Sequence, residues 1–343
     1  MTAAFARRSP AAVAIALATV YLVWGSTYLA IRVTDRTMPP FLMSSVRFLI
    51  AGAALYVFAS RGRARPTLRE WRAAAIVGAA LLLVGNGGVA WAETRLDSGF
   101  AALIVAVIPL YVALMDRAFF GRRLSQSAIL GLVIGFVGVA VLVRPGGGGH
   151  VGTALILLAT TSAWSAGSLY ARGAPLPSSP LQAAAMQMLA ASVFLGIAGV
   201  VAGEPSQVHA DSFGTKPLIA FAYLVLVGSL IAFSAYAWML KNVRISTVAT
   251  YAFVNPVVAV ALGAMFLGEE ITAPTVFAGA SIVLAVVLIV TSKQRYPGSD
   301  EAVQSEASPA AVGRGVSRRN RARAGAVRAW RRAVPAGARG GTG

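Results

Sequence analysis

The amino-acid sequence predicts an all-α integral membrane protein with ten transmembrane helices arranged as a 5+5 inverted-topology repeat. Three observations lead to this fold class. The 343 residues are 57% hydrophobic and 12% charged, whereas soluble domains are about 45–50% apolar and about 25% charged. Ten apolar stretches are long enough to span a bilayer. Finally, rare residues of the first half recur in the second half at a nearly constant offset.

Apolar stretches of about 20 residues, the length that a helix needs to cross the hydrocarbon core, occupy most of the chain. They cover about residues 11–33, 40–60, 73–92, 98–116, 125–143, 151–171, 180–203, 217–239, 246–267 and 273–291. Because backbone polar groups must be satisfied inside lipid, each stretch is predicted to be a helix. The basic start resembles a signal peptide, but its apolar run continues to Val33, which predicts an uncleaved first helix.

Basic residues are distributed unevenly over the linkers between these stretches. With the N-terminus in the cytoplasm, 15 Lys and Arg residues lie on the cytoplasmic side and five on the outer side, leaving aside Arg47 and the arginines beyond Tyr296. The positive-inside rule therefore predicts a multi-pass protein of the cell (cytoplasmic) membrane with both termini in the cytoplasm. The predicted segments are a cytoplasmic N-terminus (1–10), two five-helix repeats (11–144 and 151–292) and a tail (293–343).

The predicted tail is basic and poor in large apolar residues, with nine arginines between Arg314 and Arg339. It cannot bury enough apolar surface to fold alone, so it is predicted to be disordered and cytoplasmic. Contact with anionic lipid is an alternative to a fully solvated tail. Nucleic-acid binding is not predicted.

The internal repeat rests on Trp, Pro and Gly matches. An offset of 140 residues pairs Trp24 with Trp164, Pro40 with Pro180 and Arg47 with Gln187, and an offset of 147 pairs Trp91 with Trp238, Pro109 with Pro256 and Gly121 with Gly268. Each half has five helices. Because five is odd, the first half ends on the opposite side of the membrane from where it began, and the second half enters from that side. Inverted repeats are typical of secondary transporters, which bind substrate near the midplane between the halves.

Polar and aromatic side chains inside the apolar stretches are the candidate substrate-binding residues. In the segment VWGSTY, helical spacing places Trp24, Thr27 and Tyr28 on one stripe. A cavity wall suits rings with polar tips, although polar groups also join helices by hydrogen bonds, and both readings stay open. The full candidate set is Trp24, Thr27, Tyr28, Arg47, Asn86, Trp164, Gln187, Tyr236, Tyr251 and Asn255.

Arg47 is the strongest candidate in this set. A charge inside a transmembrane helix costs on the order of 3 kcal/mol, which makes it a functional candidate by default. Its guanidinium is predicted to face a cavity, where it can bind a carboxylate or an exposed backbone carbonyl. The alternative is that the long side chain reaches back to the membrane surface.

Two prolines, Pro109 and Pro256, are predicted to lie inside their helices at matched positions of the repeat. Each removes a backbone donor and tends to kink its helix, which leaves the carbonyls of Val105 and Ala252 without a helical partner. Because such a proline occurs at the matched position of each half, the two are predicted to act as paired hinges or as a paired lining of the cavity.

Several chemistries are not predicted. The chain has no cysteine, and its two histidines, His150 and His209, fall in linkers, so neither a metal site nor an enzyme is expected and no cofactor is predicted. Carboxylates at helix ends, such as Glu93 and Glu269, are expected to be solvated. No residue is therefore singled out as the carrier of a coupling ion.

The segments VWGSTYLAIRV, PPFLMSSVRFLIAG and FLGEEIT resemble the drug/metabolite transporter superfamily, specifically its EamA-type ten-helix transporters. The resemblance covers about residues 11–292. It implies carriage of small metabolites, often amino acids or their analogues, usually outward from the cytoplasm. One departure is GRRLS, with Arg122 and Arg123 where relatives often carry an acidic residue.

Taken together, the sequence predicts a secondary transporter that exports small metabolites by alternating access, with amino acids, their analogues or drugs as substrates and proton coupling left open. A non-transporting scaffold or sensor that acts through the basic tail is one alternative, and a membrane enzyme acting on lipid intermediates is another. The predicted partners are a small-molecule substrate and the lipid bilayer, and a homodimer is left open.

Overall fold

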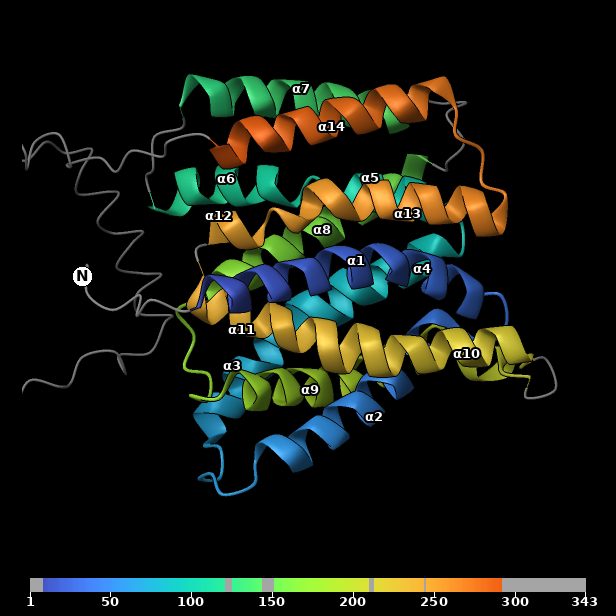
Figure 1. Cartoon of the computed structure of the whole chain (residues 1–343). Helices are drawn as coiled ribbons and strands as arrows, with labels where there is room; N and C mark the ends of the chain where they lie inside the picture. Colours follow the sequence, from blue (N-terminus) through green and yellow to red (C-terminus); the bar gives the residue numbers. More distant parts are fainter. Residues whose placement is uncertain (1–8, 121–124, 144–150, 210–212, 244, 292–343) are drawn as a thin grey trace, which may run out of the picture.

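A computed structural model describes residues 9–120, 125–143, 151–209, 213–243 and 245–291. The predicted tail, most of the predicted N-terminal segment, and Arg122 and Arg123 lie outside these ranges. Within them every regular element is a helix, and the helices run side by side in one bundle (Figure 1).

The first half of the described chain contains α1 (Pro10–Thr34), α2 (Pro40–Ala59), α3 (Leu68–Gly78), the π-helix η1 (Ala79–Gly87), α4 (Gly88–Glu93), α5 (Ser98–Val105), α6 (Ile108–Phe120) and α7 (Gln126–Val143). The second half contains α8 (Val151–Ala171), α9 (Pro180–Val201), the short η2 (Glu204–Gln207), α10 (Thr215–Tyr223), the π-helix η4 (Leu224–Phe233), α11 (Ser234–Asn242), α12 (Ile245–Val248), α13 (Tyr251–Leu267) and α14 (Ala273–Thr291).

Local sequence explains where several helices begin and end. A proline lies in the first turn of α1, α2 and α9, where its missing N–H costs nothing. The α3 helix starts with a capping box, in which the Thr67 hydroxyl and the Glu70 carboxylate each accept a backbone N–H of the other residue. The α13 helix ends at Leu267 and is capped by Gly268, whose φ of 69° favours glycine.

Seven helical segments are long and apolar enough to cross a membrane. They are Pro10–Thr34, Pro40–Ala59, Leu68–Glu93, Ser98–Phe119, Val151–Ala171, Pro180–Val201 and Thr215–Asn242. Shorter apolar helices occupy Gln126–Val141, Val254–Leu267 and Ala273–Ile289, in the other three predicted stretches. An all-α membrane protein is therefore confirmed, while the count of ten spans stays a prediction.

The bundle has two peripheral helix pairs. In Figure 1, α7 and α14 pack together along one edge, and α2 and α9 pack together along the opposite edge. Between them, α1 packs against α13, and α8 packs against η1, α5 and α6. The centre of the bundle is thus enclosed by helices from both halves of the sequence.

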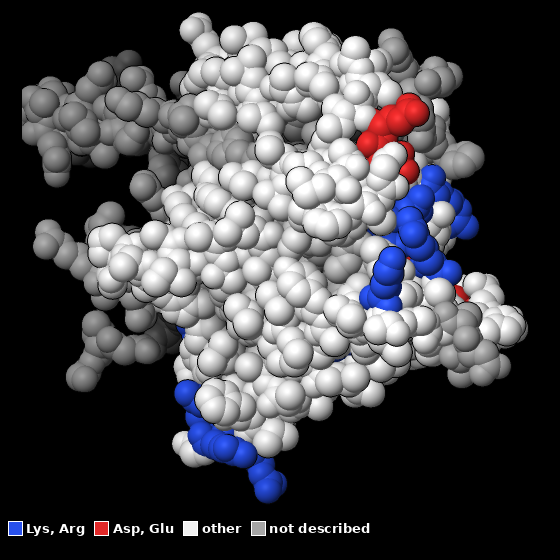
Figure 2. Space-filling view, turned by 45° about the vertical axis from the view of Figure 1, so that its right-hand side comes forward, with Lys and Arg blue, Asp and Glu red and all other residues white. Residues whose placement is uncertain are grey.

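The surface of the bundle is apolar between two charged ends. Figure 2 shows charged side chains at opposite ends of the face in view and uncharged residues between them. Large apolar side chains are exposed on the bundle, including Phe58, Val201 and Phe266. A soluble protein rarely exposes so much contiguous apolar surface, whereas lipid tails match it.

Close contact between α3 and α9 depends on Gly78. A Cβ atom added at this position would lie 2.5 Å from the backbone oxygen of Gln187. We expect Gly78→Ala to lower the free energy of unfolding by about 1–3 kcal/mol, because a backbone atom cannot move aside as a side chain can. Thermal unfolding of the purified protein measures this. Gly152→Ala in α8, where a Cβ meets no atom within 4 Å, is the matched control, and equal stability of the two variants would contradict the prediction.

The prolines lie at different depths in their helices. The prediction that Pro109 lies inside a continuous helix is not met, because α5 ends at Val105 and α6 starts at Ile108. Pro109 is thus in the first turn of α6, where a proline fits without loss of a helical hydrogen bond. Pro256 does lie inside α13, and a separate interruption at residues 249–250 precedes that helix. The hinge roles of both stay predictions.

Candidate substrate cavity

A cavity of about 60 Å³ lies inside the bundle, between helices of both halves. Its wall includes α1, α2, η1, α8, η4 and α13. Eight of the ten residues proposed from the sequence line it, namely Trp24, Thr27, Tyr28, Arg47, Asn86, Trp164, Tyr251 and Asn255. The structure therefore brings together side chains that are as far as 231 positions apart (Trp24 and Asn255) in the sequence.

Tyr236 supports the cavity wall from behind. It is buried, its ring centroid lies 4.8 Å from that of Trp24, and its hydroxyl accepts a hydrogen bond from the Trp164 indole at 3.2 Å. With Tyr251, these rings form an aromatic cluster of Trp24, Trp164, Tyr236 and Tyr251. Edge-to-face pairs of this kind contribute about 0.5–1.5 kcal/mol each beyond burial, so the cluster stabilises this wall of the cavity.

Gln187 lies elsewhere. It is 4% exposed in α9, but it is not among the residues that line the cavity. Its backbone oxygen faces Gly78 of α3, so it belongs to the contact between these helices. The matched position in the repeat thus places Arg47 at the cavity and Gln187 away from it.

Arg47 is 2% exposed and lines the cavity, so it does not reach back to the membrane surface. Its Nε donates a hydrogen bond to the Ser229 hydroxyl at 2.8 Å, and its guanidinium carbon lies 4.8 Å from the centroid of the Phe48 ring. Its Nη1 atom has no hydrogen-bond partner among the described residues. The structure thus holds one end of the guanidinium and leaves a donor free.

Two further buried polar atoms of the cavity residues lack partners within the described ranges, the Oδ1 of Asn86 and the hydroxyl of Tyr251. Such groups are costly to bury unless a ligand or water satisfies them. By contrast, the Asn255 amide, in the orientation that suits its neighbours, donates to the carbonyls of Tyr251 and Tyr21. Asn255 therefore joins α13 to α1, whereas Arg47, Asn86 and Tyr251 offer unused hydrogen-bonding capacity.

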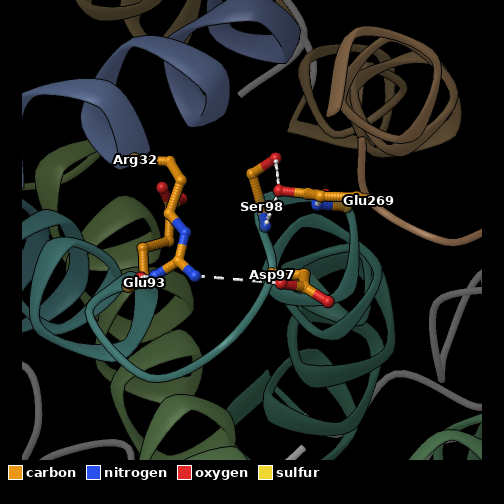
Figure 3. Close-up of polar contacts among 6 residues, drawn as sticks. Arg32, Glu93, Asp97, Ser98 and Glu269 are labelled. Carbon is orange, nitrogen blue, oxygen red and sulfur yellow. Dashed lines mark hydrogen bonds and ion pairs between the residues drawn. The ribbon is translucent and has the colours of Figure 1, made fainter. Parts of the chain in front are cut away.

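One end of the bundle is closed by charged side chains, and we call it the Glu93 end. Figure 3 shows Arg32 between Glu93 and Asp97, with Ser98 and Glu269 beside them. The Arg32 guanidinium lies 3.8 Å from the Asp97 carboxylate and donates a hydrogen bond to the backbone carbonyl of Glu93. This arrangement links the end of α1 to the hairpin between α4 and α5.

Two other carboxylates close the same end by binding helix starts. Glu269 accepts hydrogen bonds from the Ser98 N–H at 2.8 Å, the Ser98 hydroxyl at 2.7 Å and the Gly99 N–H at 3.0 Å. Glu204 accepts those of the Phe41 and Leu42 N–H groups at the start of α2, at 3.0 and 2.7 Å. Each carboxylate satisfies backbone donors that a helix start leaves open.

The expectation that helix-end carboxylates are solvated is wrong for Glu93, which is 0% exposed. The cause is the short hairpin to α5, which folds back and packs the end of α4 against α1. Nearby, burial raises the pKa of the Asp35 carboxyl well above its ordinary range. Burial, and next the Glu269 carboxylate, raise the pKa of Asp97. The sequence carries one signal for this network, the clustering of acids in the linkers on one side.

A bundle of apolar helices around a central cavity with aromatic and polar walls defines the class of membrane carriers. The chain belongs to the EamA-like transporter family, whose model matches residues 11–144 and again 151–291. The resemblance drawn from the sequence motifs is thereby confirmed. The chain is a multi-pass transporter of the cytoplasmic membrane.

Individual relatives extend over most of the chain. The uncharacterized inner membrane transporter YedA of Escherichia coli K12 is 40% identical over 286 residues, which is 82% of this chain and 92% of YedA. A probable terminal-alkyne amino-acid exporter of Streptantibioticus cattleyicolor is 27% identical and covers 81% of this chain and 93% of its own.

A more distant relative is a probable amino-acid metabolite efflux pump of Escherichia coli K12, which is 22% identical over 79% of this chain and 91% of its own. One solved crystal structure, described only as that of a protein, matches with a TM-score of 0.60 at 23% identity. It covers 82% of this chain and 96% of its own, and the likeness concerns the fold.

Proposed function

We propose that this transporter exports small zwitterionic metabolites, namely amino acids or their analogues, from the cytoplasm by alternating access. The observation that carries the proposal is the set of unpartnered polar atoms at the cavity. A guanidinium nitrogen of Arg47 is free to bind a carboxylate. The amide oxygen of Asn86 is free to accept a hydrogen bond from an ammonium group.

The aromatic cluster would contact the side chain of the substrate, while Arg47 and Asn86 bind its carboxylate and ammonium groups. Rings of Trp24, Trp164 and Tyr251 line the cavity, and they suit the apolar or aromatic side chain of an amino acid. The cavity has a volume of about 60 Å³. Export by alternating access requires that it open to each side of the membrane in turn.

The repeat predicted from the sequence is part of this proposal, and the helix contacts support it. Exchanging the two halves maps α2 onto α9 and α7 onto α14, and each of these helices packs against its counterpart. The same exchange relates the α1–α13 contact to the α8–α6 contact, and the α2–η4 contact to the α9–η1 contact. This is the pattern expected of a pseudo-twofold axis between inverted repeats.

The π-helical segments give independent support for the repeat. The segment Leu68–Glu93 has η1 between α3 and α4, and Thr215–Asn242 has η4 between α10 and α11. These segments occupy corresponding places in the two halves. Wide turns of this kind are rare and occur often at functional sites, and η1 and η4 contribute Asn86 and Gly228 to the cavity wall.

The proposed direction and orientation rest on charge and on relatives. Under the positive-inside rule, the end that carries Arg61, Arg63, Arg65, Arg69 and Arg72 faces the cytoplasm. The Glu93 end then faces outward. The names of two relatives, an amino-acid exporter and an amino-acid metabolite efflux pump, support both the substrate class and outward transport.

Efflux from preloaded cells tests the proposal. Cells with and without the protein are loaded with labelled amino acids, and the rate of loss is measured before and after the proton gradient is collapsed. Faster loss of one or a few amino acids is the expected result. Equal loss of every amino acid in both cell lines would contradict the substrate class. Deletion of the residues after Lys293 separates a carrier, which keeps its flux, from a scaffold that acts through the tail.

A further inference from the structure

The carboxylate of Glu93 has an unusual environment. The residue is 0% exposed, and neither Oε1 nor Oε2 has a hydrogen-bond partner among the described residues. The neighbouring cation Arg32 donates instead to the backbone carbonyl of the same residue and pairs with Asp97. At the same end Glu204, Glu269 and Asp97 each have a hydrogen-bond or ion-pair partner, whereas Asp35, like Glu93, has none among the described residues.

An ionised carboxylate without donors is expensive to bury, and a neutral carboxyl group is far less so. The surroundings add to this preference, because among the described residues Asp35 and Glu269 act on Glu93 as like charges and Arg32 alone acts as an opposite charge. The closed conformation of this end therefore favours a Glu93 side chain that carries a proton.

We propose that Glu93 is the proton-binding site of this transporter, and that its protonation state controls the opening of the Glu93 end. The inference rests on the proposed function and deepens it, because it identifies the coupled ion as a proton. The proton comes from water on the side that the Glu93 end faces, binds one carboxylate oxygen, and leaves the group as a free proton when it ionises.

Competition between Glu93 and Asp97 for the Arg32 guanidinium explains how one proton can open or close the Glu93 end. When Glu93 is neutral, the Arg32 guanidinium stays with Asp97 and holds α1 to the start of α5 (Figure 3). When Glu93 is ionised, its carboxylate attracts the same guanidinium away from Asp97. The contact between α1 and the hairpin is then weakened, and water can reach the buried group.

The other charged groups around Glu93 do not compete for this role. Glu269 is held by three donors, and Asp97 is about half exposed and paired with Arg32. Asp35 is also unpartnered, but it interacts with Arg47 and Arg32 as well as with Glu204. The phenol of Tyr28 is the remaining titratable neighbour.

Glu93 is also close to the cavity. Tyr28 interacts electrostatically with Glu93 and lines the cavity. Val89, one turn before Glu93 in α4, lines it as well. A proton at Glu93 thus sits between the closed end and the substrate site, as coupling of the two requires.

Thiol labelling tests the proposal, because the protein contains no native cysteine. A single Val89→Cys reporter is labelled with a membrane-impermeant maleimide in the purified protein, from about pH 5 to about pH 9, the range over which buried carboxylates in proteins ionise. The rate is divided by that of an exposed Ser206→Cys reporter at the same pH, which corrects for the pH dependence of the maleimide reaction with an exposed thiol.

The expected result is that the normalised rate rises with pH by about fivefold or more, a modest shift between closed and open populations. Adding Glu93→Gln, which mimics the protonated group, keeps the rate low at every pH. Adding Glu270→Gln, the same change at an exposed neighbour, leaves the pH dependence intact. A pH dependence that survives Glu93→Gln, or a rate that never depends on pH, would overturn the proposal.

Asp97→Asn provides a second variant in case Glu93→Gln does not fold. It removes the partner that holds Arg32 in place, so the reporter should be labelled faster than in the parent even at low pH. An unchanged low-pH rate would contradict the competition for Arg32. Labelling needs no substrate, so failure of the efflux experiment with normal pH-dependent labelling would count against the substrate class and leave the proton site standing.

Discussion

Arg47→Ala is expected to lower the initial rate of substrate efflux by about ten- to a hundredfold. One charge-assisted hydrogen bond is worth about 1.5–3 kcal/mol, and about 1.4 kcal/mol corresponds to a factor of ten. The free Nη1 of Arg47 at the cavity is the donor that the alanine variant removes. Arg47→Lys keeps the charge but loses the planar fork, so an intermediate rate is expected.

The same variant should remain folded. Removing Arg47 takes a buried charge out of the bundle, and its partner Ser229 keeps a hydrogen bond to the Leu224 carbonyl at 3.0 Å. The thermal unfolding temperature of Arg47→Ala should therefore stay close to that of the parent. Arg95→Ala removes an exposed arginine that stacks on Trp91 and is the matched control for transport. A normal efflux rate in Arg47→Ala would end the role assigned to this side chain.

Glu269→Ala is expected to destabilise the protein by about 3–5 kcal/mol. The change leaves two backbone N–H groups and one hydroxyl at the start of α5 without their acceptor, and each hydrogen bond to a charged group contributes about 1.5–3 kcal/mol, though not additively. The unfolding temperature should fall on the order of 10 °C. Glu269→Gln keeps one acceptor atom and should lie between the two.

Glu270→Ala is the control for this experiment. The side chain is adjacent to Glu269 in sequence and is exposed, so its loss should change stability by no more than about 0.5 kcal/mol. If Glu269→Ala and Glu270→Ala unfold at the same temperature, the carboxylate of Glu269 does not hold the start of α5.

Much of the cavity could be predicted because polar side chains in apolar helices are costly. Arg47, Trp24 and Asn86 stand out in their segments for this reason, and all three line the cavity. The same argument fails for Gln187. Polarity indicates that a side chain avoids lipid, but contact with another helix satisfies it as well as a cavity does. Only the packing of α9 against α3 separates these cases.

The closed Glu93 end could not be predicted. Phe41 is held by Glu204, 163 residues later in the chain, and Ser98 is held by Glu269, 171 residues later. Linker residues carry no periodic pattern that indicates such contacts. Because Glu93 lies at a helix end, the sequence predicted an exposed side chain. The hairpin that follows packs the end of α4 against α1 and buries it. The π-helices η1 and η4 likewise were not predicted, because each lies within one apolar stretch of the sequence that was interpreted as a single helix.

The contact between Trp24 and Trp164 joins the two halves of the chain, with ring centroids 5.5 Å apart and planes at 82°. Two indoles that are this close and not parallel give a coupled circular dichroism signal near 280 nm. We expect this signal to fall when the cavity widens and α1 moves away from α8. Circular dichroism would then report the distance between the two halves without any label.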